Sequence, residues 1–309
     1  MNKITPSQTT AWLLTATVAP ILCIAGKTDW LPTLVSALVC GVITIACLRL
    51  EWEYAPHWLC VVELIWLVVM LAGIAQQSST CWAVTGDEWQ IAAVLLLLAG
   101  FSAQKGASPA ARVGATLIWL ILPVLGIVLA AGTTQINLEW VDNQFQMPHG
   151  LLISLLLIPA LGIFLPRHTR KGGWAILALG IIAVVGAVIM DGVMGKQVSA
   201  NTANAIYEFS KGVNLFGVAE RFEALVACAL TSGWFALLSM LLSVAYHLTE
   251  RMVPHRGQWG IWICIALSLL LLCNLHISAV LMGLGSLIFW GFLPVLTQGI
   301  VKLKKVEKS

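Results

Sequence analysis

Charged side chains are scarce in this chain of 309 residues: Asp, Glu, Lys and Arg make up 10%, against 59% hydrophobic residues and a mean hydropathy of +0.91. So apolar a composition excludes an ordinary soluble domain and predicts an integral membrane protein set in a lipid bilayer. The net charge is +3, but the basic residues lie between apolar runs and form no patch interleaved with polar sequence. Nucleic-acid binding is therefore not expected.

Sequence motifs of catalysis and metal binding are also missing. The chain has no phosphate-binding glycine loop, no His-Glu-x-x-His pattern and no nucleophile paired with a base, so we expect neither an enzyme nor a bound cofactor. Of the eight cysteines, only Cys81 lies in a polar segment. The others fall within or at the ends of apolar runs and predict neither a disulfide framework nor a metal site: Cys23, Cys40, Cys47, Cys60, Cys228, Cys264 and Cys273.

Ten apolar stretches approach the roughly 20 residues that a transmembrane helix requires. They cover about 8–26, 31–49, 58–76, 89–104, 113–132, 150–165, 172–194, 219–247, 258–276 and 278–300. Short connections join them, so we expect residues 1–309 to form a single transmembrane domain. Two sets of five spans result, repeat one at about 8–132 and repeat two at about 150–300. Because five is odd, the second set enters the membrane from the opposite side, as in an inverted repeat.

Lys and Arg concentrate in cytoplasmic loops and so predict the orientation of the spans. If the N-terminus lies inside, thirteen basic residues fall in inside segments: Lys3, Arg49, Lys105, Arg112, Arg167, Arg170, Lys171, Arg251, Arg256, Lys302, Lys304, Lys305 and Lys308. Four fall outside: Lys27, Lys196, Lys211 and Arg221. We therefore expect both termini in the cytoplasm.

Spans 1 and 6 carry prolines at corresponding positions of the two repeats. Pro20 lies about twelve residues into span 1, and Pro159, followed by Gly162, lies about ten residues into span 6. Matched Pro/Gly interruptions predict discontinuous helices whose freed backbone groups hold a small solute at the midplane, although a simple kink is the alternative. The expected substrate-binding residues are Thr15, Thr17, Ala19, Pro20, Pro159, Leu161 and Gly162. Hydrogen bonding of the threonine hydroxyls to their own helix is the competing interpretation.

Ionisable residues beside or within apolar runs form a second group of candidates. The segment "GVAERFEAL" places Glu220, Arg221 and Glu223 at the outer start of span 8, where they either organise an outer gate or are a solvated helix start. An amphipathic helix at about 203–217 precedes them and is expected to lie across the outer mouth. Glu63, some five residues into span 3, is expected to couple a proton or to form an ion pair, and the alternative is a side chain that snorkels to the cytoplasmic interface.

Two stretches carry a resemblance to a known family. "ITPSQTTAWLL" with "KTDWLPTLVSALVCGVI", and "LFGVAERFEALVACALTSGWFALLS", resemble the first two helices and the eighth helix of the spore-germination permease family, the B subunits of germinant receptors. The resemblance implies the amino acid, polyamine and organocation transporter superfamily, with a five-plus-five, LeuT-like inverted-repeat fold. It further implies an amino-acid-like nutrient and partner subunits that include a lipoprotein. Span 6 departs from the family pattern, because Pro159 stands where an acidic residue is expected.

The sequence therefore predicts an all-α, permease-like membrane protein that senses or transports a small nutrient, with an amino acid as the favoured nutrient. We expect it to act as a subunit of a spore germinant receptor in a bacterial cell membrane or spore inner membrane. One alternative is a free-standing, ion-coupled amino acid transporter. Ser232 and Ser239 would then be the available oxygens in the middle of span 8. A non-transporting membrane scaffold subunit is the other alternative.

Overall fold

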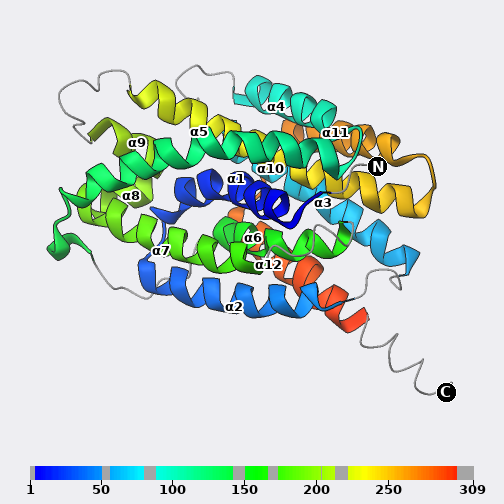
Figure 1. The fold of residues 1–309 in the computed structure, drawn as a ribbon, viewed down its shortest axis with the longest axis horizontal. Helices are drawn as coiled ribbons and strands as arrows, with labels where there is room; N and C mark the ends of the chain where they lie inside the picture. Colours follow the sequence, from blue (N-terminus) through cyan, green and yellow to red (C-terminus); the bar gives the residue numbers. More distant parts are fainter. Residues whose placement is uncertain are drawn as a thin grey trace.

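The chain folds into a bundle of membrane helices in the computed structural model, which describes residues 4–50, 56–79, 88–141, 150–165, 173–202, 204–212 and 222–297 (Figure 1). The first five membrane helices are α1 (Pro6–Ala25), α2 (Trp30–Leu48), α3 (His57–Ser79), α4 (Glu88–Ala103) and α5 (Ala107–Thr133). The next five are α6 (Gly150–Leu157) continued by the 3₁₀ helix η4 (Ile158–Phe164), α7 (Gly173–Met194), α10 (Phe222–Met252), α11 (Gly257–Asn274), and α12 (Ala279–Ser286) continued by the π-helix η6 (Leu287–Phe292).

These helices confirm the ten predicted spans, most of them to within a few residues. Eight are long and apolar enough to cross a membrane, and the two shorter apolar helices, Trp89–Ala103 and Gly150–Phe164, correspond to spans 4 and 6. The protein is therefore an integral membrane protein with an all-α fold in its described part.

Helix α1 lies at the centre of the bundle and contacts α5, α7 and α10 (Figure 1). Its apolar window is 78% buried, whereas the windows of α2 and α5 are only 28% buried and turn most of their side chains outward. Exposed apolar side chains such as Trp119, 82% exposed on α5, face the surroundings of the bundle. Apolar side chains on the outer surface of the bundle suit a lipid environment, because hydrocarbon solvates apolar side chains.

Two glycines bring helix backbones unusually close. A Cβ at Gly233 of α10 would lie 2.4 Å from the Cβ of Ala19 on α1, and a Cβ at Gly150 of α6 would lie 2.2 Å from the carbonyl oxygen of Ala279 on α12. Only glycine fits at either position without a shift of the neighbouring helix. Small residues at such crossings are the usual means of close packing in membranes, where no hydrophobic driving force joins the helices.

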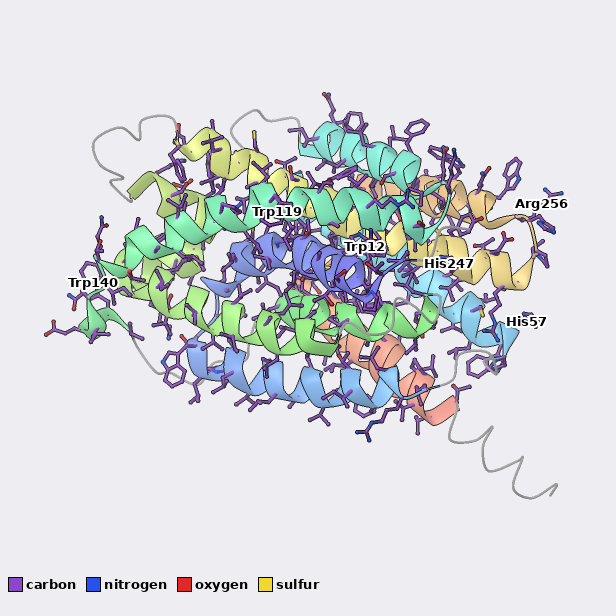
Figure 2. All side chains as sticks on the ribbon, viewed as in Figure 1. Trp12, His57, Trp119, Trp140, His247 and Arg256 are labelled. Atoms are coloured by element: carbon purple, nitrogen blue, oxygen red, sulfur yellow. The ribbon has the colours of Figure 1, made fainter. Side chains whose placement is uncertain are left out.

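The connecting segments alternate between the two ends of the bundle. Trp140, in the 3₁₀ helix η3 (Leu138–Trp140) after α5, lies at one end, and His57 and Arg256 lie at the opposite end (Figure 2). This arrangement agrees with the predicted alternation of inside and outside segments. We name the end that carries Trp140 the outer end, following the charge-based prediction of orientation.

Two short helices cover the outer end between α7 and α10: α8 (Lys196–Asn201) and α9 (Ala205–Gly212) (Figure 1). The predicted amphipathic helix at 203–217 is thus observed over 205–212, and its residues 203 and 213–217 lie outside the described part. Ile206 and Phe209 are fully buried, while Lys211 forms an ion pair with Glu208 on the exposed side. An apolar face turned to the bundle therefore fixes α9 in place. Helix α8 was not predicted.

Candidate functional site

The sixth span changes helix type in its middle. The backbone is α-helical from Gly150 to Leu157. From Ile158 to Phe164 it forms a 3₁₀ helix of seven residues, with Pro159 in the first turn. Such helices rarely exceed three or four residues, and a mid-helix stretch often marks a functional hinge. Proline contributes by removing a backbone donor from the α-helical pattern. The predicted discontinuity of span 6, and its location at Pro159, are confirmed.

Span 1 differs from the prediction, because α1 is one continuous helix from Pro6 to Ala25 and passes through Pro20. The hydroxyls of its buried threonines are occupied locally: Thr15 Oγ1 donates to the carbonyl of Ala11 at 2.8 Å, and Thr17 Oγ1 donates to the carbonyl of Leu13 at 2.5 Å. Neither donor is directed at a site between α1 and α6. The expectation of a matched pair of broken helices was wrong for α1.

The predicted substrate-binding residues of the two spans nevertheless lie in the buried centre. Helix α1 contacts α6, and α10 contacts η4, so the change of helix type faces the core of the bundle. Pro159, Leu161 and Gly162 are all buried, as are Ala19 and Pro20. Their backbone groups are the polar atoms that these residues offer to a solute.

Several buried polar atoms on α1 and α10 lack a hydrogen-bond partner among the described residues, and three of them lie within the central part of the two helices. They are Nε1 of Trp12, Nε1 of Trp234 and Oγ of Ser239. Buried polar groups are almost always hydrogen-bonded in native proteins, so an unpartnered donor is expected to meet water or a bound molecule. Both indole nitrogens are donors only, and they therefore suit an acceptor such as a carboxylate.

Lateral grooves on the bundle do not coincide with these residues. One groove of about 520 Å³ lies between α1 and α5 and is bordered by Gln8, Trp119 and Pro123. Another, of about 460 Å³, lies between α3, α10 and α11 beside Ile65 and Ile263. Their lining is almost entirely apolar, so they match acyl chains better than a polar solute.

Glu63 on α3 is the most deeply buried carboxylate in the described part of the spans, with 1% of its surface exposed and no hydrogen-bond partner for either oxygen. Cys47 of α2 lies within its electrostatic range and donates from Sγ to the carbonyl of Trp290, at 3.4 Å, in the π-helix η6. Thr44, one turn before Cys47, has an unpartnered buried hydroxyl. Glu63 thus lies near a polar junction of α2, α3 and η6, and no ion pair of the described residues involves it. The expected roles, proton coupling or ion pairing, stay predictions.

The charged cluster predicted at the start of span 8 is described only in part. Glu220 and Arg221 lie outside the described residues, and Glu223 lies in the first turn of α10, half-buried. The pKa of Lys211 on α9 is raised, chiefly by its hydrogen bond to Glu208 and to a smaller extent by charges that include Glu223. Glu223 is therefore close enough to Lys211 for a weak electrostatic interaction, and its role in an outer gate stays a prediction.

An ion pair at the outer end was not foreseen from the sequence. Lys196 Nζ of α8 lies 2.7 Å from Asp29 Oδ1, where Asp29 precedes α2. The sequence does show that Asp29 stands directly before an apolar span, and an acidic residue is common at the start of a helix. Nothing in the sequence indicates that its partner lies 167 positions away.

Comparison with known proteins supplies one informative result. No family model and no curated protein sequence matches this chain. Solved structures do match, and one of them is described as the crystal structure of MhsT in complex with L-phenylalanine. The match has a TM-score of 0.55 at 12% sequence identity and covers 94% of each chain. The protein therefore has the predicted LeuT-like fold.

Proposed function

We propose that this chain is a permease-like membrane protein that binds a small amino-acid-like solute beside the α6–η4 junction. The observation that carries the proposal is the buried change from α-helix to 3₁₀ helix at Ile158, next to α1 and α10. Irregular backbone inside a membrane is tolerated where protein or a cavity satisfies its polar groups, and in inverted-repeat transporters it holds the substrate. The amino-acid-like solute has support from the LeuT-like fold, since MhsT, which shares it, was solved in complex with L-phenylalanine.

The finer proposal is a spore germinant receptor subunit rather than an enzyme, located in a bacterial cell membrane or spore inner membrane with both termini cytoplasmic. Its support is the resemblance of "ITPSQTTAWLL" and "LFGVAERFEALVACALTSGWFALLS" to the spore-germination permeases. In that setting the chain senses the nutrient and assembles with a larger membrane subunit and a lipoprotein. Co-purification of those subunits with the tagged chain tests this assembly, and recovery of the chain alone contradicts it.

Thermal stability in detergent tests the binding site itself. A solute that binds only the folded protein raises the melting temperature with its concentration, so we expect such a rise with at least one amino acid in a screen that includes sugars and nucleosides. Replacing Pro159 with alanine restores a backbone donor and favours the α-helix, and should remove the rise. Pro123→Ala is the matched control, because Pro123 also lies inside a membrane helix but is exposed, on the continuous helix α5. An unchanged response of Pro159→Ala contradicts the proposed site.

Ion-coupled transport is the second candidate function, and the unpartnered Glu63 carboxylate favours it. Proteoliposomes with an imposed proton or sodium gradient distinguish the two functions. Accumulation of the solute in response to the gradient supports a transporter, whereas binding without flux supports a sensor. A scaffold subunit that has lost its site would show neither binding nor flux.

A further inference from the structure

Helix α8 draws two carboxylates to one of its faces at the outer end of the bundle. Lys196 Nζ lies 2.7 Å from Asp29 Oδ1, and Ser199 Oγ donates to Asp191 Oδ1 at 2.8 Å. Because Lys196 and Ser199 are three residues apart on a helix, they project from the same side of α8. Asp29, before α2, and Asp191, near the end of α7, therefore lie beside each other although they belong to different repeats.

Each of these carboxylates has one oxygen without a partner. Asp29 is 4% exposed and Asp191 is 2% exposed, and Oδ2 of both is buried without a hydrogen bond to any described residue. The described charges that act on Asp191 are those of Asp29 and Lys196. Two carboxylates and one ammonium leave a net charge of −1 in a buried place. Such an uncompensated charge is costly unless a counterion or a proton neutralises it.

We propose that the free oxygens of Asp29 and Asp191 bind one small monovalent cation, with Na⁺ as the best match. Carboxylate oxygens are hard ligands that suit hard cations, and a single positive charge completes the neutrality of the cluster. A divalent ion would leave an excess positive charge beside Lys196. The bound cation joins the α1–α2 connection to the end of α7, and so holds the segment that leads into α9 across the outer end.

This site is separate from the proposed solute site, and its test requires no solute. The melting temperature of the purified protein is measured in NaCl and in N-methyl-D-glucamine chloride at equal ionic strength, with Na⁺ titrated between the two. We expect a saturable rise with Na⁺ in the parent protein and no such rise in Asp29→Asn or Asp191→Asn. Glu208→Gln is the matched control, because it removes one negative charge from the same end at an exposed side chain and should retain the rise.

Removing the lysine tests the charge balance directly. Lys196→Met leaves two carboxylates without a positive neighbour, so we expect a larger Na⁺-dependent rise and a new stabilisation by Ca²⁺ that the parent protein lacks. Each comparison is made within one variant, so a loss of intrinsic stability does not obscure it, and Lys196→Met decides the matter if the asparagine variants do not fold. A parent protein insensitive to Na⁺ overturns the proposal. Stabilisation by acid alone also overturns it and assigns a shared proton to the pair.

Discussion

Replacing Phe209 with alanine should detach α9 from the outer end of the bundle. Phe209 is fully buried, and its ring lies against Gly132 at the end of α5, where a Cβ would come within 2.2 Å of Cζ. A buried Phe→Ala change costs about 3–5 kcal/mol. The remaining large apolar side chain that α9 buries, Ile206, contributes only about 1.5–3 kcal/mol. An eight-residue helix has little stability of its own, so the loss should open α9 locally rather than unfold the protein.

The thiol of Cys23 reports this opening. Cys23 is buried on α1, one turn before Gly26, and Gly26 lies against Ala205 of α9. A loss of 3 kcal/mol or more should raise the open population, and the labelling rate of Cys23 by a membrane-impermeant maleimide, by about 100-fold. Peptide mapping by mass spectrometry separates Cys23 from the other thiols.

A matched control and a second variant make the result decisive. Leu138→Ala removes an apolar side chain from the same end, but Leu138 is exposed, so labelling of Cys23 should stay at the parent level. Gly132→Val displaces the ring of Phe209 from the other side of the contact. Its effect should not add to that of Phe209→Ala, because both variants remove one interaction. Parent-like labelling of Cys23 in a folded Phe209→Ala protein refutes the role of α9 as a cover.

Three other substitutions test the interior. Glu63→Gln removes an unpartnered buried charge and should keep or raise the melting temperature while abolishing any solute-driven proton uptake; a marked loss of stability would indicate a structural ion pair. Gly233→Val forces α10 away from Ala19 and should cost about 1–3 kcal/mol in thermal unfolding, whereas Gly126→Val, with open space around it, should cost less than half as much. Thr17→Val should leave solute binding intact, since the hydroxyl already bonds to its own helix, and a lost response in the thermal screen would show otherwise.

The two prolines show how far sequence reasoning reaches in this fold. Apolar runs predicted all ten membrane helices, because burial in lipid acts on each segment by itself. Pro20 and Pro159 both lie within apolar runs at corresponding positions, yet only Pro159 accompanies a change of helix type. Pro20 lies where α1 packs closely against Gly233 of α10, and surrounding helices can hold a proline-containing helix in regular form. Packing against the neighbouring helices decides whether a proline leaves its helix continuous or changes the helix type. The local sequence around the proline does not show which neighbours it will meet.

The candidate sites divide in the same way. The burial of Glu63 follows from its place within an apolar run, and the position of α9 follows from its amphipathic pattern, so both were predictable. The pairing of Asp29 with Lys196 depends on which loops meet at the outer end, which is a property of the complete topology. The π-helix η6 beside Cys47 contains Gly291, but the α-helical α12 before it contains Gly283 and Gly285, so glycine does not distinguish the two helix types.

Helix α4 also has a consequence for the surrounding bilayer. Its 16 residues span about 24 Å, and the neighbouring α11, with 18 residues, spans about 27 Å, against a hydrocarbon thickness of about 30 Å. Both helices expose apolar side chains, among them Phe101 and Ile263, on one side of the protein. Lipid along this side must thin by several ångströms to match them, at a fraction of a kcal/mol per ångström. The protein therefore carries a local deformation of the membrane with it, and thinner bilayers should accommodate it at lower cost.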